Sequence, residues 1–274
     1  MKPPSQNSAA EAAPAAVEAA AAPKAAPTGT QAIDRAVAIL RALERGGAMT
    51  ATEVAASVGL HVSTAHRILR SLCAHGLLGQ SPTDDRYQLG LATVLLGRAA
   101  AEQLGLSAIV SHLEALRDET GETVNLGVRV DDEVAVAASI PSRHPLRVEN
   151  QPGVRNPIHA CAMGKTLLAF GDGRISVPEP YTRFTTTTLT TQARIDRDLE
   201  RIRARGFAIN DEERSLGIRS VGAPVYDDRG RLIAAIAVQG PIARMSEERL
   251  PAIYAAADRT ATALRGVADS IAAP

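Results

Sequence analysis

The sequence of 274 residues is poor in cysteine and aromatic residues and has no excess of charge of either sign. Its two cysteines, Cys73 and Cys161, are too few for a disulfide-built secreted fold or a CxxC-type zinc site. Aromatic residues make up 3% and tryptophan is absent, which argues against a groove that stacks successive bases on rings. Because 30 basic residues balance 30 acidic ones, bulk charge cannot carry nucleic-acid binding, and any such contact must be local.

The chain also lacks a long apolar run, and we expect no signal peptide in it. The uncharged segment 232–243 contains Gln, Gly and Pro and is too short to span a bilayer. Lys2 is followed by prolines, polar residues and glutamates instead of a continuous apolar stretch. Alanine and proline dominate residues 1–30, so we expect a disordered tail there. We therefore expect a cytoplasmic protein of about two domains, without metal or cofactor.

The segment 31–91 has the pattern of a winged helix-turn-helix domain. Apolar spacing predicts helices at 32–46, 51–58 and 62–75, joined by short glycine turns. Thr50 and Glu53 have the spacing of a capping box at the start of the second helix. Two short strands, 77–80 and 86–89, flank a turn-rich segment and form the expected wing.

The third of these helices is two-sided, as expected for a helix that reads DNA. At about 100° per residue, one face carries Ser63, Arg67, Arg70, Ser71 and Ala74, and the other carries Ala65, Ile68, Leu69, Leu72 and Cys73. No acidic residue lies between His61 and His75. Hydroxyl and guanidinium groups donate to phosphates and guanine edges. We predict DNA contacts from Ser63, Thr64, His66, Arg67, Arg70 and Ser71, and from Arg86 on the wing. The alternatives are an ordinary amphipathic surface helix, and for Arg86 a solvated charge beside the turn.

The rest of the chain mixes helical and strand periods. We expect a linker helix at 92–106, within helical spacing that Gly97 and Gly105 interrupt, and an α/β domain at 107–274. Predicted hairpins cover 123–140 and 219–238, and a further strand lies at 207–210. Predicted helices lie at 162–170, around 195–202 and from about 246. The fold class is therefore α+β.

Chemistry in this second half favours ligand binding over catalysis. Gly164-Lys165-Thr166 ends like a phosphate loop, but His159 stands where the first glycine is required. Cys161 and His159 resemble a nucleophile and its base, but no spacing supplies an orienting group or an oxyanion site. A helix that begins near Ala162 offers free backbone N–H groups to a carboxylate. Asn210 could point into the same cavity, and the acidic residues 211–213 form either the solvated back of that site or a plain charged loop.

From about Gln31 to Ala268 the chain resembles the IclR family of bacterial transcriptional regulators. The resemblance rests on stretches that recur in order, namely Ser63-Thr-Ala-His-Arg67, Tyr87-Gln-Leu-Gly90, Gly153 with Pro157-Ile-His-Ala160, Gly164-Lys165, Gly206-Phe-Ala-Ile-Asn-Asp-Glu-Glu213 with Gly217, Ala223-Pro-Val225 and Gly240-Pro241. It implies a winged helix-turn-helix, a linker helix and a GAF-like effector-binding domain. It also implies a homodimer or tetramer on double-stranded operator DNA, as repressor or activator.

The resemblance also implies where a small organic acid would bind. The pocket residues implied by position are Asn125, His159, Ala160, Cys161, Asn210, Ser220, Ala237 and Gln239. Members that sense keto acids carry Asp where this chain has Asn210, and small hydroxyls or thiols where it has Ala237 and Gln239. This neutral, amide-lined cavity favours polar neutral groups beside the carboxylate, as in an aromatic or sugar-derived acid.

Two other classes of function compete with a ligand-responsive regulator. One is a metabolite-processing enzyme whose N-terminal helices only bind a partner. The other is a structural nucleic-acid-binding protein, which the zero net charge and the long second half disfavour. Turnover of the ligand without sequence preference on DNA would indicate the enzyme.

Overall fold

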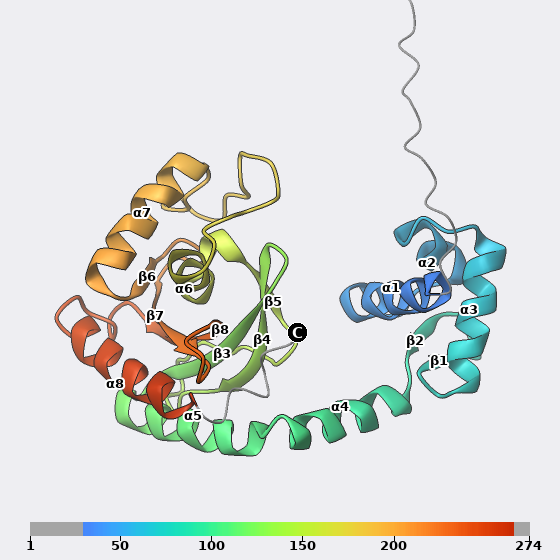
Figure 1. The fold of residues 1–274 in the computed structure, drawn as a ribbon, viewed down its shortest axis with the longest axis horizontal. Coiled ribbons are helices and arrows are strands. Elements are labelled where there is room, and N and C mark those ends of the chain that lie inside the picture. The colour runs from blue at the N-terminus through green and yellow to red at the C-terminus, as the bar shows by residue number, and fades with distance from the viewer. Residues whose placement is uncertain (1–29, 266–274) are drawn as a thin grey trace, which may run out of the picture. The chain divides into compact units, whose positions relative to one another are not determined.

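A computed structural model describes residues 30–265. The expected tail lies outside the described residues, apart from Thr30. The chain forms two compact units that divide between Val94 and Leu95, and each has its own core (Figure 1).

The N-terminal unit has three helices and a two-stranded sheet. They are α1 (Gln31–Gly46), α2 (Ala51–Ser57), α3 (Val62–Ala74), β1 (Leu78–Gln80) and β2 (Tyr87–Leu89). This order is the predicted winged helix-turn-helix. The two strands pair antiparallel, and Met49 bridges to Tyr87, which ties the start of α2 to the wing. The core is an apolar cluster to which all three helices and both strands contribute, made of Ile39, Leu43, Val54, Leu69, Leu72, Leu78 and Tyr87.

Local hydrogen bonds and one glycine fix both ends of α2, including the turn between α2 and α3. The predicted capping box is present: Thr50 Oγ1 accepts from the Glu53 backbone N–H, and the Glu53 carboxylate accepts from the Thr50 N–H. Gly59 has φ of 64°, a left-handed conformation that favours glycine. The turn closes with a hydrogen bond from Leu60 N–H to Ala55 O of 2.9 Å. The two helices are therefore held at a fixed turn.

Two helices follow the wing, α4 (Leu91–Gln103) and α5 (Leu106–Thr120). Gly105, with φ of 64°, separates them as predicted. Gly97 does not interrupt α4, contrary to expectation, because a single glycine weakens a helix without ending it. Large apolar side chains of α4 are exposed to solvent, namely Leu91, Val94, Leu95 and Leu96.

The C-terminal unit is built on one antiparallel six-stranded sheet in the order β5-β4-β3-β8-β7-β6. Its strands are β3 (Thr123–Val130), β4 (Glu133–Ile140), β5 (Arg155–Pro157), β6 (Ala208–Asp211), β7 (Ile218–Tyr226) and β8 (Leu232–Pro241). Both predicted hairpins are present. The short strand β5 was missed, because three residues ending in proline carry no alternating pattern.

Helices cover both faces of this sheet. Along β8, Ala234, Ile236 and Val238 face α5 and α8 (Leu250–Ala263), while Ala235 and Ala237 face α6 (Ala162–Phe170) and α7 (Gln192–Arg205). This alternation is why the uncharged strand is apolar on both sides. The C-terminal helix α8 begins at Leu250 and not near residue 246, since Pro251 favours the first helical turn. Figure 1 shows α5 and α8 on one side of the sheet and α6 on the other.

Candidate functional site

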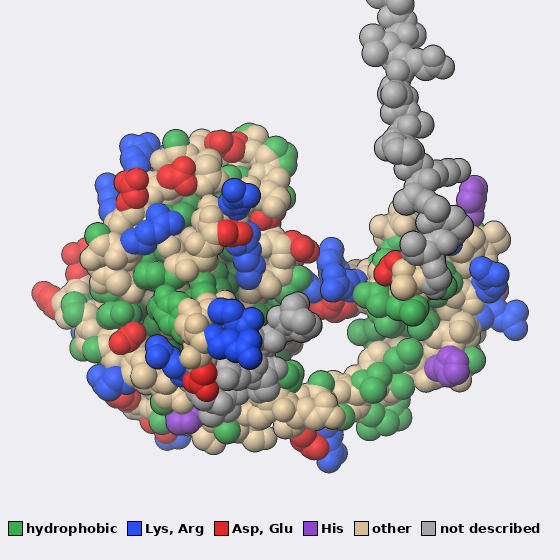
Figure 2. All heavy atoms as spheres, viewed as in Figure 1, with side chains coloured by type: hydrophobic (Ala, Val, Ile, Leu, Met, Phe, Trp, Pro, Cys, Tyr) green, Lys and Arg blue, Asp and Glu red, His purple; other side chains and the backbone are tan. Residues whose placement is uncertain are grey.

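The outer face of α3 is the first candidate site. Ala65, Leu69 and Leu72 are buried in the core, which turns the opposite side of the helix to solvent. The exposed side chains border a shallow depression, namely Ser63, His66, Arg67, Arg70 and Ser71. Thr64 is half-buried. Figure 2 shows basic side chains on the α3 side of this unit. The helix therefore presents the predicted donors outward.

Arg86 on the wing is engaged within the protein. Its Nη1 donates to Ala48 O (2.9 Å) and to a Glu53 carboxylate oxygen (3.2 Å), and its Nε lies 3.7 Å from Asp84. Hydrogen bonds from Thr50, assisted by the charge of Arg86, lower the pKa of Glu53. Arg86 therefore joins the wing to α2. A contact of Arg86 with DNA stays a prediction.

The second candidate site is a cavity of about 270 Å³ in the C-terminal unit. The structure brings six of the expected pocket residues into its wall: Ala160, Cys161, Asn210, Ser220, Ala237 and Gln239. Ala162, where the sequence predicts a helix start that could hold a carboxylate, also lines the cavity. The other lining residues are not predicted by the sequence and come mainly from the loop before β5, the start of α6 and the β6–β7 connection; they are Val148, Glu149, Asn150, Val154, Asn156, Met163, Arg214, Ser215 and Ile218. Loops contribute most of them, and loops carry no periodic signal in the sequence.

Two expected pocket residues, Asn125 and His159, do not lie in this wall. Asn125 is fully buried on β3 and donates to Gln239 Oε1 at 3.5 Å, so it reaches the cavity only through Gln239. The 3-10 turn Ile158–Ala160 places His159 against Tyr181 and Phe184, with Nε2 2.9 Å from Thr182 O. Burial lowers the pKa of His159. Position along the chain could not reveal this, because the turn changes the direction of successive side chains.

The first turn of α6 is held rigidly at the cavity. Cys161 caps the helix, since its Sγ accepts from the Gly164 N–H at 3.3 Å. Asn210 Nδ2 donates to Ala160 O at 2.9 Å and fixes the preceding turn. Burial raises the pKa of Cys161 to about 11, so the thiol is protonated at neutral pH and is a poor nucleophile.

Helix α6 also lies unusually close to the sheet. A Cβ atom built on Gly222 of β7 would lie 2.3 Å from Thr166 Oγ1 and 2.7 Å from Ala162 O. Only glycine allows this approach. Gly222 therefore sets how deep the helix start lies in the cavity wall.

Lys165, the lysine of the phosphate-loop-like motif, forms ion pairs in the interior of the C-terminal unit. It is 1% exposed, and its Nζ lies 2.7 Å from Asp198 on α7 and 2.5 Å from Glu213 after β6. Burial raises the pKa of Glu213, which Lys165 opposes. The expectation that the acidic run 211–213 is solvated is therefore wrong for Glu213, which is buried because a buried lysine needs a partner.

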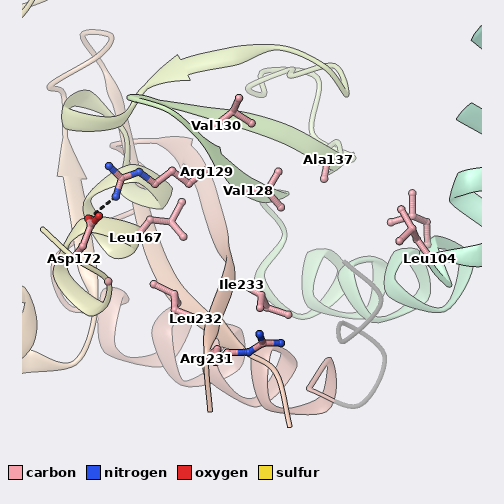
Figure 3. A pocket seen from close by; sticks show the side chains of 12 residues that line it. Leu104, Val128, Arg129, Val130, Ala137, Leu167, Asp172, Arg231, Leu232 and Ile233 are labelled. Carbon is pink, nitrogen blue, oxygen red and sulfur yellow. Dashed lines mark hydrogen bonds and ion pairs between the residues drawn. The ribbon is translucent and has the colours of Figure 1, made fainter. Parts of the chain in front are cut away.

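A larger groove of about 700 Å³ lies elsewhere on the same unit (Figure 3). Its walls are mainly apolar side chains, including Leu104, Val128, Leu167, Leu232 and Ile233. Arg129 at its edge is paired with Asp172 at 2.6 Å. None of the expected site residues lines this groove. Within residues 30–265 no cluster of His, Cys, Asp and Glu is arranged to hold a metal ion, and no helix of that range could cross a bilayer.

Comparison with known proteins identifies both units. The IclR helix-turn-helix domain matches residues 32–82, and the domain described as bacterial transcriptional regulator IclR C-terminal matches residues 100–265. The HTH-type transcriptional regulator BhcR of Paracoccus denitrificans (strain Pd 1222) is 36% identical over 230 residues, which cover 82% of this chain and 82% of BhcR.

Solved structures have the same fold. An IclR transcriptional regulator from Silicibacter sp. TM1040 superposes with a TM-score of 0.76 at 22% identity, covering 89% of this chain and 97% of that one. An IclR homologue from Microbacterium hydrocarbonoxydans, solved in complex with 4-hydroxybenzoate, superposes with a TM-score of 0.68 at 21% identity, covering 87% of this chain and 99% of that one.

These matches decide between the classes of function considered above. The relatives are transcriptional regulators, so the chain is not a metabolite-processing enzyme. The helix-turn-helix match and the exposed polar face of α3 lie in the same unit. The chain belongs to the IclR family of bacterial transcriptional regulators, with a DNA-binding helix-turn-helix domain and a C-terminal effector domain.

Proposed function

We propose that the protein is a cytoplasmic, ligand-responsive regulator that reads operator DNA with α3 and a small organic acid with the cavity of its C-terminal unit. The observation that carries the proposal is the outer face of α3. It presents Ser63, His66, Arg67, Arg70 and Ser71 to solvent on a helix that lacks acidic residues. A helix of this width enters the major groove of DNA.

The residues of α3 have different tasks in this proposal. Arg67 and Arg70 can pair bidentately with a guanine edge or hold a phosphate, while Ser63, Thr64, Ser71 and His66 complete the contacts with backbone and bases. Arg86 supports them indirectly, because its bonds to Ala48 and Glu53 fix the wing against α2.

We also propose that the protein acts as a homodimer or a dimer of dimers. The exposed apolar side chains of α4, with Leu91 at 72% and Val94 at 64% exposure, favour burial against a second copy. Helix-turn-helix dimers bind two half-sites about one helical turn apart. The domain boundaries 31–91, 92–106 and 107–274 are part of the same proposal.

The cavity suits an organic acid because the N-terminal turn of α6 forms part of its wall. Backbone N–H groups and the helix dipole favour a carboxylate there. Ser220, which is 5% exposed, adds a hydroxyl to the wall of the cavity. The Microbacterium homologue was solved in complex with 4-hydroxybenzoate, which is an organic acid, and this supports the proposed class of ligand.

Gel-shift titration tests this function. The full chain is titrated against its own upstream DNA and against a shuffled fragment of equal length, at matched salt, with and without organic acids. We expect preference for the upstream fragment and a change of affinity on adding an acid. Equal affinity for both fragments at every salt concentration would contradict operator reading.

Calorimetry tests the proposed effector site. The heat of binding of an organic acid to the wild type should disappear in Asn210→Ala or Ser220→Ala.

A further inference from the structure

The acidic residues nearest to Arg214 in sequence are all bound to other groups. The run 211–213 precedes it directly. Asp211 binds the Arg219 guanidinium at 2.7 and 3.0 Å. Glu212 accepts from the Gly217 N–H at 2.6 Å, and Glu213 pairs with Lys165. None of these carboxylates forms an ion pair with Arg214.

The side chain of Arg214 is held ready for a ligand. It lines the cavity, is half-buried, and its guanidinium carbon lies 4.3 Å from the centroid of the Phe184 ring. A cation–π contact of this kind uses no hydrogen-bond acceptor, so the N–H groups of the guanidinium stay available for a bidentate contact. Within the part of the chain that the structure describes, this side chain has no hydrogen bond or ion pair. The carboxylate of the cavity wall, Glu149, is already bound to Arg147.

The ring of Phe184 is held in place by two further aromatic side chains. Its ring stacks on His159 with centroids 6.0 Å apart, and His159 packs against Tyr181 at 5.3 Å. Burial raises the pKa of Cys161, and the positive charge of Arg214 acts against this rise. Arg214 and the start of α6 line the same cavity, where the guanidinium charge and the helix dipole have the same sign.

The side-chain amide of Gln239 in the cavity wall has its oxygen occupied by neighbouring residues. Gln239 Oε1 accepts from Asn150 Nδ2 at 3.2 Å and from Asn125 Nδ2 at 3.5 Å. With its oxygen occupied twice, Gln239 has its NH₂ group available for the cavity. Ser220 adds a hydroxyl that is bound to no other described residue.

We propose that Arg214 binds the carboxylate of the effector and that Gln239 donates to a second oxygen of the same molecule. The inference rests on the proposed effector role of the cavity. The effector class is then an organic acid with a further oxygen acceptor: a carbonyl, a hydroxyl or a second carboxylate. Acids without that second oxygen bind more weakly, and neutral amides of the same shape do not bind.

The test uses the full chain and matched pairs of acids, measured by calorimetry. The pairs are glyoxylate with acetate, succinate with butyrate, and 4-hydroxybenzoate with benzoate. We expect at least one acid with two acceptors to bind saturably and at least about tenfold more tightly than its one-acceptor partner. A tenfold change corresponds to about 1.4 kcal/mol.

Variants separate the two contacts. Arg214→Gln should weaken the bound acid about tenfold or more, and Arg214→Lys should be intermediate, because an ammonium keeps the charge and loses the fork. Gln239→Met removes the donor without placing a negative charge beside Arg214 and the bound acid, so it should abolish the preference within a pair. Arg229→Gln, with the same charge change on an exposed turn, should bind like the wild type.

Each outcome decides something. Tight binding of an acid by Arg214→Gln, equal to the wild type, would overturn the assignment of Arg214 and leave the proposed regulator function intact. Unchanged preference in Gln239→Met would overturn the assignment of Gln239. Failure of all six acids to bind the wild type would overturn the ligand class, while sequence-specific binding to the upstream DNA would still support the DNA-reading part of the proposed function.

Discussion

The guanidinium of Arg86 on the wing lies 3.2 Å from the carboxylate of Glu53 at the start of α2. The same carboxylate accepts the Thr50 N–H at 2.8 Å and completes the capping box. One side chain therefore serves both the cap of α2 and the attachment of the wing. Because α2 packs against α3, this arrangement fixes the helix that we propose reads DNA.

Loss of the cap should destabilise the chain measurably. Thr50→Ala removes the oxygen that accepts from the Glu53 N–H, and we expect unfolding to become easier by about 1 kcal/mol. Urea denaturation followed by circular dichroism measures the change. Thr50→Ser keeps the hydroxyl and should unfold like the wild type. Identical midpoints for the Ala and Ser variants would show that the cap does not contribute.

Removal of the buried lysine should have a larger effect. Lys165→Met leaves Glu213 and Asp198 without their partner, and a broken buried ion pair costs about 3–5 kcal/mol. Chemical denaturation of the full chain measures this loss. The double variant Lys165→Met with Glu213→Gln removes one unpaired charge and should recover part of the stability. A double variant as unstable as the single one would contradict the account.

The buried imidazole predicts a pH dependence. Burial lowers the pKa of His159 in the folded chain below its ordinary value of 6.5, while the unfolded chain keeps that value. Below pH 6.5 the unfolded state therefore binds a proton that the folded state does not, so stability falls as the pH falls toward the folded pKa. Above pH 6.5 the His159 imidazole is neutral in both the folded and the unfolded state, so its contribution to the free energy of unfolding is constant.

Unfolding curves between pH 8 and pH 5 measure this effect against His159→Gln, which cannot titrate. The difference in unfolding free energy between the two proteins should change below pH 6.5 in favour of the variant. A difference that is the same at every pH would show that His159 has an unshifted pKa.

Much of the fold could be predicted from local sequence patterns, whereas the contacts of Arg214 and Lys165 in and near the cavity could not. The capping box, the two faces of α3 and the strands on either side of Asp131-Asp132 depend on neighbours in sequence, and the structure has them where the sequence predicts them. By contrast, Phe184 lies 30 residues before Arg214, and Asp198 lies 33 residues after Lys165. Contacts between residues so far apart leave no periodic pattern in the sequence. The ion-pair partners of Lys165 and the position of Arg214 in the cavity wall could therefore not be predicted from the sequence.

The structure brings the expected pocket residues on the sheet strands into one cavity wall, and it places the expected residue of a turn elsewhere. Ser220 and Ala237 face the cavity because strand alternation fixes their side, and Asn210 lies in register with Ser220. His159 lies in a 3-10 turn whose side-chain directions follow from tertiary packing against Tyr181. The position of His159 in the sequence therefore does not predict that its side chain lies outside the wall of this cavity.

The central claim is that the exposed face of α3 reads DNA, and Arg67→Ala tests it most directly. Fluorescence anisotropy would compare this variant with the wild type and with Arg229→Ala on the same labelled upstream fragment at matched salt. We expect Arg67→Ala to lose about 1–3 kcal/mol of binding free energy if it contacts a guanine, and less if it contacts only phosphate. Arg229→Ala should bind like the wild type. Equal affinity of all three proteins would contradict the claim that Arg67 lies on the surface that reads DNA.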